Sequence, residues 1–305
     1  MDDEGPACAA PAPLVRGRRL RVGHSRPLHA RATVFLYGGG RPVREERAAM
    51  GDTGAASGQV ACVWCAPGGD GAHAERLAAS LGVPMREGAP ADDELALALD
   101  ADGLFLAGDG MRMRGDFAAM EKRLRQANLP RELLVRAARV KGVAAPHVVD
   151  ATAGMGEDGF LLAAAGFRVT LFERDPVIAA LLSDALARAA LDDRLAPVAA
   201  CIAFIEGDSI AALEGWDPPA PDVVLLDPMF PARRKSAAVK KKFQLIHRLE
   251  RPCADEADLF AAARAAGPRK IVVKRPPKGP RLAGAAPSYS LQGKAVRYDC
   301  YVFAR

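Results

Sequence analysis

The chain has 305 residues, with 42 lysines and arginines against 37 aspartates and glutamates, and half of its residues are apolar. This composition excludes fibrous and wholly disordered proteins, and no apolar run approaches the roughly 20 residues that a membrane-spanning helix needs. Six cysteines in a chain of this length do not form the disulfide framework of a small secreted protein, and the acidic start Asp2-Asp3-Glu4 argues against a mitochondrial presequence, so we expect a cytoplasmic protein.

Residues 1–57 have a composition dominated by Ala, Gly, Arg and Pro, without a helical or strand period. They hold nine arginines and six acidic residues, and they end in a Gly-rich stretch. Such a segment buries too little apolar surface to offset the entropy cost of ordering it. We therefore expect residues 1–57 to be a disordered extension.

Residues 58–140 read as a small α+β domain. Apolar alternation and turn residues predict its strands, and the helical period of 3.6 residues predicts its helices. The expected elements are a strand over 60–64, a helix over 72–81 closed by Gly82, a meander of strands over 95–114, and helical structure over 117–140 interrupted at Pro130.

From residue 141 to residue 305, strands and helices alternate, which predicts parallel βαβ units in a doubly wound sheet. We expect a Rossmann-like α/β domain. Asp175-Pro176 has the residue types of a helix N-cap and first turn. Two runs around Gln292-Gly293 predict an antiparallel hairpin at the C-terminal edge of the sheet.

A glycine-rich loop follows the first strand of this domain, in the sequence Asp150-Ala-Thr-Ala-Gly-Met-Gly-Glu-Asp-Gly159. In a nicotinamide-dependent dehydrogenase the first glycine comes directly after the strand and a pyrophosphate binds at the helix N-terminus. Here an acid ends the strand, and Glu157 and Asp158 occupy the helix start, where they repel a pyrophosphate. A cationic ligand such as S-adenosylmethionine, which carries a sulfonium and an amino group, suits the loop better, although a purely structural glycine turn stays open.

Acidic residues also end the next two predicted strands. Glu173 is placed to accept hydrogen bonds from ribose hydroxyls, as in dinucleotide-binding folds. Asp208-Ser209 follows the third strand, where an adenine ring would pass, and an ordinary helix N-cap is an equal alternative for this pair.

The motif Asp227-Pro-Met-Phe230 follows the fourth strand. A carboxylate and a neighbouring carbonyl accept hydrogen bonds from a planar exocyclic amine and direct its lone pair at a methyl donor, while an aromatic ring stacks on an extruded base. Asp227 and Phe230 are therefore the expected catalytic residues.

Four blocks together resemble the small-subunit ribosomal RNA methyltransferase J family: residues 150–158, 172–176, 226–241 and 272–276. The resemblance covers roughly residues 59–305. It implies a class I methyltransferase fold, S-adenosylmethionine as cofactor, and transfer of a methyl group to guanine N2 in 16S rRNA or the small ribosomal subunit, with no metal and no membrane partner.

The resemblance also carries binding positions over to this chain. Two positions depart from the family pattern: Glu157 stands where we expect Arg, which leaves it a backbone role, and Asp208 stands where we expect a small hydroxyl residue. The expected cofactor-binding residues are Asp150, Gly154, Gly156, Glu157, Asp158, Glu173, Arg174, Asp208, Ser209 and Asp227.

Basic residues flank the expected active site, and phosphate contacts by Lys and Arg supply most of the affinity in RNA binding. The expected RNA-binding residues are Arg233, Arg234, Lys235, Lys240, Lys241, Lys242, Lys274 and Arg275.

Two other functions stay open from the residues alone. One is a methyltransferase for another planar amine, such as DNA adenine N6 or a protein glutamine. The other is a non-catalytic RNA-binding protein with a methyltransferase fold, which the intact glycine loop and Asp227 motif disfavour.

Overall fold

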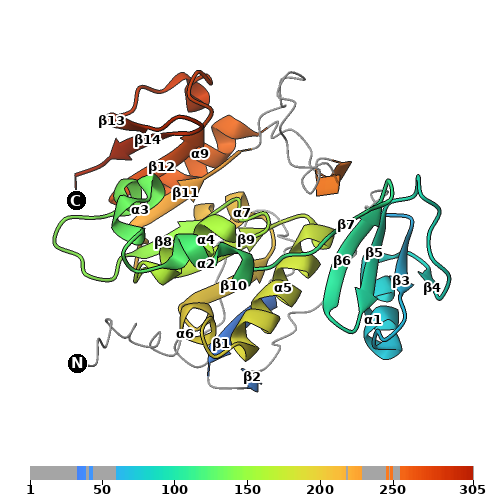
Figure 1. Ribbon diagram of the computed structural model, residues 1–305. Coiled ribbons are helices and arrows are strands. Elements are labelled where there is room, and N and C mark those ends of the chain that lie inside the picture. The colour runs from blue at the N-terminus through green and yellow to red at the C-terminus, as the bar shows by residue number, and fades with distance from the viewer. Residues whose placement is uncertain are drawn as a thin grey trace, which may run out of the picture.

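The computed structural model describes residues 33–38, 41–43, 60–217, 219–228, 245–246, 248–249 and 255–304. These residues form a nine-stranded sheet and a five-stranded sheet with helices packed on them (Figure 1). For residues 33–38 and 41–43 only the backbone is described.

The larger sheet has the strand order β13-β14-β12-β11-β8-β9-β10-β1-β2. Its five central strands run parallel, and β14 and β13 add an antiparallel hairpin at one edge. The Rossmann-like fold and the C-terminal hairpin predicted from the sequence are thereby confirmed. The strands named here are β8 (His147–Asp150), β9 (Arg168–Glu173), β10 (Ile202–Glu206), β11 (Val223–Leu226), β12 (Lys270–Arg275), β13 (Tyr289–Gln292) and β14 (Arg297–Val302).

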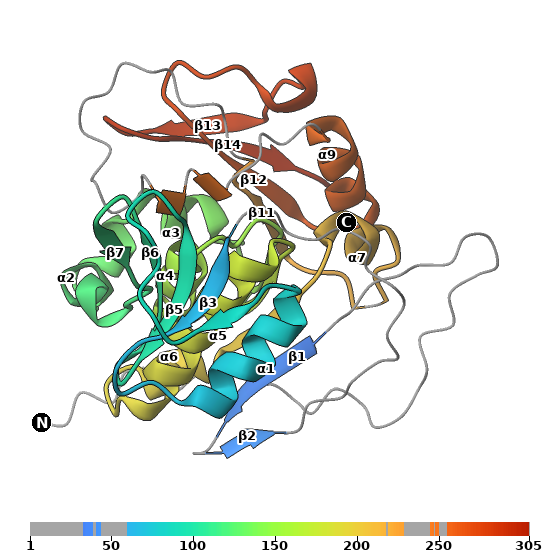
Figure 2. The ribbon, with the colours of Figure 1, turned by 90° about the vertical axis from the view of Figure 1, so that its right-hand side faces the viewer.

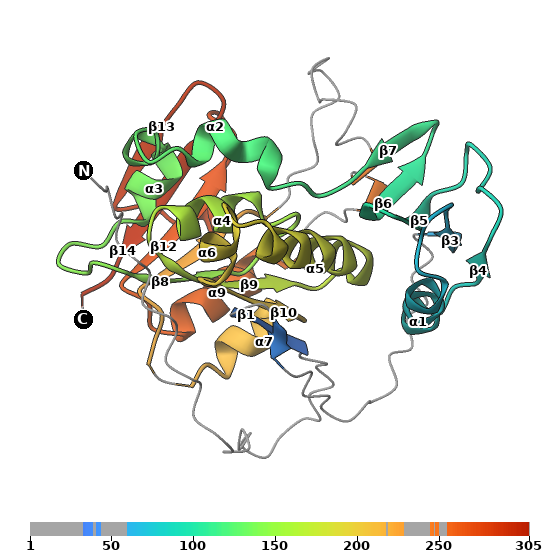
Figure 3. The same ribbon diagram turned by 60° about the horizontal axis from the view of Figure 1, so that its bottom comes forward.

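Helices cover both faces of this sheet, with α4 and α5 on one side and α7 and α9 on the other (Figure 3). Neighbouring residues of one strand therefore enter different cores: Val148 packs with α4 and α5, and Val149 packs with α7 and α9. Burial on both faces explains why the central strands are continuous apolar runs in the sequence. The helices are α4 (Glu157–Ala164), α5 (Pro176–Leu191), α6 (Ala196–Ala199), α7 (Ser209–Glu214) and α9 (Glu256–Ala265).

Helix α5 begins as the sequence predicted. Asp175 caps it, because its Oδ1 accepts hydrogen bonds from the backbone N–H groups of Val177 at 3.0 Å and Ile178 at 3.1 Å. Pro176 occupies the first turn, where its missing N–H costs nothing. The cap fixes the chain directly after the end of β9 and so positions Glu173.

The smaller sheet has the order β4-β3-β5-β6-β7 and lies to the right of the larger one in Figure 1 and in front of it in Figure 2. Its core is continuous with helix α5, since Leu97 and Leu106 belong to the same buried cluster as Ile178 and Leu181. The elements are β3 (Cys62–Cys65), α1 (Gly71–Leu81), β4 (Met85–Arg86), β5 (Ala96–Asp100), β6 (Gly103–Gly108) and β7 (Met111–Met113).

The segment after β7 belongs to the core of the larger sheet. Phe117 stacks on Phe160 of α4 with ring centroids 4.1 Å apart, and Leu129 and Leu134 are buried in the same cluster. The smaller unit therefore ends near residue 116, earlier than the boundary at 140 that the sequence predicted. The segment contains η1 (Ala118–Met120), α2 (Glu121–Leu124), η2 (Leu129–Arg131) and α3 (Leu133–Ala138). The helical structure is interrupted as the sequence predicted, but the break after α2 comes before Pro130, which lies in η2.

Two strands lie within the segment that we expected to be wholly disordered. Strand β1 (Thr33–Gly38) pairs antiparallel with β10, and β2 (Arg41–Val43) pairs with β1. The expectation for residues 1–57 is wrong for these strands, because the open edge of β10 supplies backbone partners that local sequence does not reveal. The rest of residues 1–57 lies outside the described residues.

Candidate active site

The candidate site lies at the carboxyl ends of the central parallel strands. Strand β8 has β11 on one side and β9 on the other, so the chain order reverses at β8. In open α/β sheets, ligands bind outside the carboxyl ends of the strands at such a reversal. Asp150, Glu173 and Asp227 all stand at this edge of the sheet, which confirms the placement expected from the sequence.

The glycine loop, residues 151–156, spans this reversal. The Ala151 N–H donates to the Leu225 carbonyl of β11 at 3.0 Å, and the Ala153 N–H donates to the Phe172 carbonyl of β9 at 3.0 Å. Gly154 and Gly156 have φ of +53° and +76°, in the left-handed region that favours glycine. The loop is thus tied to the strands on both sides of β8.

Gly159 serves close packing of the following helix on the sheet. A Cβ added there would lie 2.3 Å from Cδ2 of Leu171 on β9. The third glycine of the motif therefore lets α4 approach β9, which brings the first turn of α4, with Glu157 and Asp158, beside the strand ends.

Glu173 connects the glycine loop to the start of α5. Its Oε2 accepts a hydrogen bond from the Gly154 N–H at 2.8 Å, and its Oε1 accepts one from the Asp175 N–H at 2.8 Å. Burial raises the pKa of Glu173, while these two backbone hydrogen bonds oppose that shift. A carboxylate oxygen has more than one acceptor site, so contact with a ribose hydroxyl stays compatible with both bonds.

Three acids and one lysine form the charged centre of the site, which we call the acid–lysine cluster: Asp150, Asp158, Asp227 and Lys274. Lys274 on β12 lies between two carboxylates, with Nζ 2.6 Å from Asp158 Oδ2 and 2.9 Å from Asp227 Oδ2. Asp150 is 2% exposed, and its Oδ1 accepts a hydrogen bond from the Thr152 N–H at 3.1 Å. The cluster therefore contains three carboxyl groups and one ammonium group to balance their charge.

Two acids of the cluster, Asp150 and Asp227, are harder to ionise than ordinary carboxyls. Burial, with repulsion from Asp158, raises the pKa of Asp150 to about 8. Burial also raises the pKa of Asp227, against the attraction of Lys274. Burial lowers the pKa of Lys274, but the charges of Asp158 and Asp227 outweigh it and hold that pKa above its usual value. The site therefore favours binding a cation, which stabilises the ionised carboxyls.

Two residues of the site were not predicted from the sequence. The Thr152 hydroxyl accepts a hydrogen bond from the Asp227 N–H at 2.6 Å, which fixes the backbone of the predicted catalytic acid. Tyr298 on β14 pairs with Lys274 in the sheet register, and burial, followed by the Asp158 charge, raises the pKa of its hydroxyl. No local pattern marks either residue, because both reach the site through contacts distant in the sequence.

The other expected cofactor-binding residues occupy different positions. Asp208 caps α7 by accepting from the Ile210 N–H at 2.8 Å, and Ser209 is buried beside it. Arg174 is exposed and pairs with Asp255 at 2.9 Å. For Asp208 the N-cap alternative is confirmed, and the cofactor contact of these three residues stays a prediction.

A pocket opens beside the glycine loop, lined by residues 113–117, Met155 and Glu157. The segment between β7 and η1 was not expected to take part in the site. It places Phe117 and Asp116 next to the first turn of α4.

The expected RNA-binding residues are only partly described. Arg275 is 1% exposed and pairs with Glu256 of α9 at 3.3 Å, so its predicted phosphate contact is wrong. Lys274 is held by two carboxylates, which leaves its ammonium group unavailable for a phosphate in this arrangement. The catalytic candidate Phe230 and the RNA-binding candidates Arg233, Arg234, Lys235, Lys240, Lys241 and Lys242 lie outside the described residues.

Neither a metal site nor a membrane span is found in the part of the chain that the structure describes. There, no three His, Cys, Asp or Glu residues are grouped to hold a metal ion. In the same part of the chain, every helix is too short or too polar to cross a bilayer.

Comparisons with known proteins cover both the glycine loop and the acid–lysine cluster. Residues 84–303 match the family of SAM-dependent methyltransferases. The chain is 44% identical over 237 residues to a Thioalkalivibrio sulfidiphilus protein named ribosomal RNA small subunit methyltransferase J, covering 75% of this chain and 92% of that one. It is 43% identical to the Pseudomonas aeruginosa protein of the same name, covering 75% and 89%.

A solved structure agrees with this similarity. A SAM-dependent methyltransferase from Neisseria gonorrhoeae has 31% sequence identity to the chain and superimposes with a TM-score of 0.62. The superposition covers 78% of this chain and 95% of the gonococcal one.

Proposed function

This chain belongs to the ribosomal RNA small subunit methyltransferase J family, and from that membership we propose that it methylates the exocyclic N2 amine of a guanosine in 16S rRNA. It is an S-adenosylmethionine-dependent methyltransferase. The observation that carries the choice of an amine substrate is Asp227, held at a parallel strand end beside the glycine loop. We place this reaction in the cytoplasm, where ribosomal RNA is found.

The residues present fit the cofactor. Asp150 and Asp158 lie beside the loop, and a cation bound there would lower the raised pKa of Asp150 and favour its carboxylate form. Gly156 lets the loop pack closely on α5, since a Cβ added there would lie 2.5 Å from Leu182 Cδ1. Glu173 is placed to accept from the ribose hydroxyls, and its bond to the Gly154 N–H couples that contact to the loop. When bound, S-adenosylmethionine supplies an electrophilic methyl group on sulfur.

Asp227 acts on the target amine. The lone pair of guanine N2 is delocalised into the ring, and an N–H bond donated to a carboxylate increases its availability at nitrogen. Oδ2 of Asp227 already pairs with the Lys274 ammonium at 2.9 Å, whereas Oδ1 accepts no hydrogen bond from the residues that the structure describes. We therefore assign Oδ1 as the acceptor of the target N–H. Thr152 fixes the backbone at this position, so the carboxylate is oriented before the substrate binds.

Lys274 keeps Asp227 in the state that this role requires. A protonated carboxyl would present a donor to the amine instead of an acceptor. Burial and the neighbouring Asp158 push Asp227 toward protonation, and the Lys274 ammonium at 2.9 Å opposes them. Lys274 is in this proposal a positioning residue, and Phe230 is the residue proposed to stack on the extruded guanine.

The experiment that tests the function is methyl transfer in vitro. The purified chain, radiolabelled S-adenosylmethionine and 16S rRNA should yield N2-methylguanosine after digestion of the RNA. In single-turnover reactions at saturating cofactor, Asp227→Ala should lower the rate by about 10²–10³, the usual cost of removing a hydrogen bond formed in the transition state. Asp227→Asn, which keeps an acceptor oxygen, should lose less. A wild-type rate in Asp227→Ala would show that the acid is structural.

The proposal also separates this chain from the two open alternatives. Methylation of DNA adenine or of a protein glutamine, with none of rRNA, would assign another planar amine. Failure to bind radiolabelled S-adenosylmethionine would assign a non-catalytic protein.

A further inference from the structure

The segment between the two sheets carries an unusual share of the positive charge. Residues 118–141 contain seven basic and two acidic residues, a net charge of +5 that equals the net charge of the whole chain. Its basic residues are Lys122, Arg123, Arg125, Arg131, Arg136, Arg139 and Lys141. The rest of the chain sums to zero net charge, because its other basic stretch, residues 233–242, is balanced by acids elsewhere.

Most of these cations have no acidic partner. The two acids of the segment are both used within it, because Glu132 pairs with Arg123 at 3.2 Å and Glu121 with Arg125 at 3.8 Å. The other five basic side chains are exposed and make no ion pair to any residue that the structure describes: Lys122, Arg131, Arg136, Arg139 and Lys141.

The apolar side of the segment fixes which way these cations face. Leu134, Val135, Ala137 and Ala138 are at most 1% exposed and lie in the core of the larger sheet, so Arg136 can only face outward. Arg136 and Arg139 are three residues apart and share one side of α3 and its C-terminal end. The array is therefore held by the packed core rather than by a loop.

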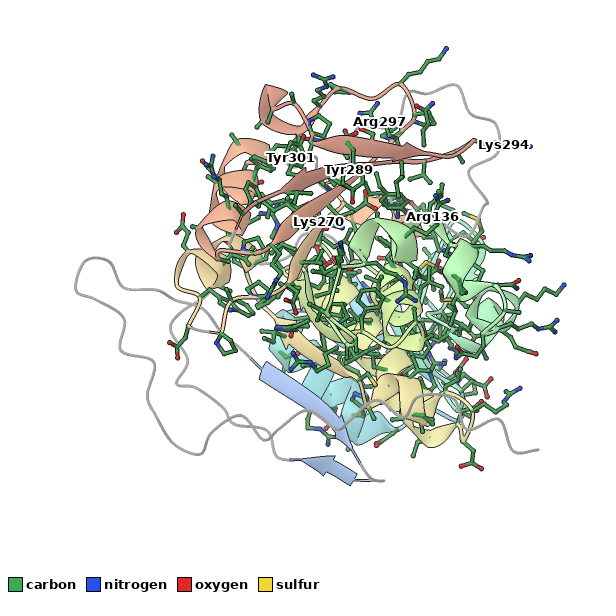
Figure 4. The ribbon with its side chains drawn as sticks, turned by 90° about the vertical axis from the view of Figure 1, so that its left-hand side faces the viewer. Arg136, Lys270, Tyr289, Lys294, Arg297 and Tyr301 are labelled. Atoms are coloured by element: carbon green, nitrogen blue, oxygen red, sulfur yellow. The ribbon has the colours of Figure 1, made fainter. Side chains whose placement is uncertain are left out.

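A sixth cation joins the array from the C-terminal hairpin. Gly293, in the turn between β13 and β14, lies against α3, since a Cβ added there would be 2.7 Å from Leu133 Cδ1. Lys294 follows it and is exposed. Figure 4 views the molecule from this side and labels Arg136 and Lys294. We call Lys122, Arg131, Arg136, Arg139, Lys141 and Lys294 the basic strip.

We propose that the basic strip binds the phosphate backbone of the rRNA around the target nucleotide. This proposal rests on the proposed function, and it assigns a surface of the protein to the binding of the rRNA substrate. The strip begins beside α4, whose first turn carries Glu157 and Asp158, because Phe117 stacks on Phe160 of α4 at 4.1 Å and Leu124 of α2 packs on the same core cluster. It continues along α3 toward the opposite edge of the sheet, where Nζ of Lys270, the first residue of β12, donates to the Arg139 carbonyl at 2.7 Å. The strip would therefore hold RNA that flanks the target.

The composition of the strip favours RNA over an acidic protein. Protein interfaces have apolar, aromatic-rich centres and are depleted in lysine. Among the described residues, the large apolar side chains that are exposed are Leu191, Tyr289 and Val302. Of these, Tyr289 lies beside the strip, because its ring centroid is 5.7 Å from Nζ of Lys270, which donates to the Arg139 carbonyl. A row of cations with a single aromatic ring beside it is instead typical of phosphate contacts, which position a nucleic acid without reading its sequence.

The test is the salt dependence of binding to a 16S rRNA transcript. The variant is Arg136→Gln/Arg139→Gln, and the matched control is Arg76→Gln/Arg264→Gln, which removes two exposed arginines from α1 and α9. Each lost phosphate contact should reduce the slope of log K against log salt by about 0.7–0.9, so the strip variant should lose about 1.4–1.8. Between about 50 and 200 mM salt its affinity should then fall about 7- to 12-fold less than that of the wild type.

Cofactor affinity and the single-turnover rate at saturating RNA should be unchanged in both variants. If the strip variant shows the same salt slope as the control variant, the proposal is wrong. It is also wrong if the strip variant binds the transcript normally but no longer binds assembled small subunits, because the strip would then contact a ribosomal protein. Lys294→Gln, in the hairpin turn, tests the same surface if the double variant fails to fold, and should reduce the slope by about 0.7–0.9. If the wild-type chain itself transfers no methyl group to 16S rRNA, the proposed function fails rather than the strip.

Discussion

Replacing Lys274 with Met should move the acidic limb of the pH–rate profile to higher pH. The substitution keeps an unbranched stem and removes the ammonium that lies 2.6 Å from Asp158 and 2.9 Å from Asp227. An opposite charge at such distances lowers a carboxyl pKa by about 1–3 units, and its loss returns that shift. Burial already raises the pKa of Asp227 against the attraction of Lys274, so removing the ammonium should raise it further. On the acidic limb, where the ionised fraction of Asp227 limits the rate, each unit of upward shift should lower the rate of methyl transfer by up to about 10-fold.

The assay is single-turnover methyl transfer at saturating cofactor and RNA, measured from acid to alkaline pH. Lys274→Arg retains the charge and should keep the limb close to that of the wild type. Lys278→Met removes an exposed lysine four residues further along the chain and controls for the loss of one positive charge. A Lys274→Met limb at the wild-type position would refute the reasoning, because Lys274 would then not set the charge state of Asp227.

Three other predictions concern the glycine loop and the strand ends. Asp150 has a pKa of about 8 in the folded chain and about 4 in the unfolded chain, so the folded state holds this proton to higher pH and stability falls as pH rises between these values. Asp150→Asn should remove up to about 1.4 kcal/mol per pH unit from that slope, measured by urea unfolding. An unchanged slope would contradict the burial of this carboxyl. Gly159→Ala should cost about 1–3 kcal/mol of unfolding free energy through its overlap with Leu171, whereas Gly88→Ala, which meets nothing, should be nearly neutral. Glu173→Ala should weaken cofactor binding by about 1–3 kcal/mol in calorimetry without creating affinity for NAD, and unchanged affinity would remove Glu173 from the cofactor site.

The parts of the fold that depend on local sequence were predictable. Asp175-Pro176 specifies a helix start through its own side chain and ring, and the apolar runs of β8 and β11 reflect burial on both faces of the sheet. The order of strand ends then follows, because carboxyl ends of parallel strands meet at one edge. For that reason the sequence alone predicts that Asp150, Glu173 and Asp227 lie together.

The partners of individual charged residues were not predictable. Lys274 and Arg275 are adjacent in the sequence and both looked available to RNA, yet neighbouring residues of a strand face opposite sides of the sheet. Lys274 therefore meets Asp158, which is 116 residues away, while Arg275 is buried against Glu256 on the other side. Strand β1 was missed for a similar reason, since its partner β10 is distant in the sequence.

The boundary between the two units shows a third limit of prediction from the sequence. The helical period over 117–140 was correctly identified, but the period states only that one side of each helix is apolar. Whether that side packs on the smaller or the larger sheet is decided by tertiary contacts such as Phe117 on Phe160. These contacts also turn the basic side of the segment outward and so create the basic strip.

Mapping of N2-methylguanosine in 16S rRNA by mass spectrometry tests the central claim most directly. The rRNA should come from a strain that lacks this protein and from the same strain complemented with the wild-type chain or with Asp227→Ala. The account predicts that one N2-methylguanosine is absent from the deletion strain, returns with the wild-type chain, and does not return with Asp227→Ala at equal expression. An unchanged set of methylated guanosines in the deletion strain, or full restoration by Asp227→Ala, would contradict it.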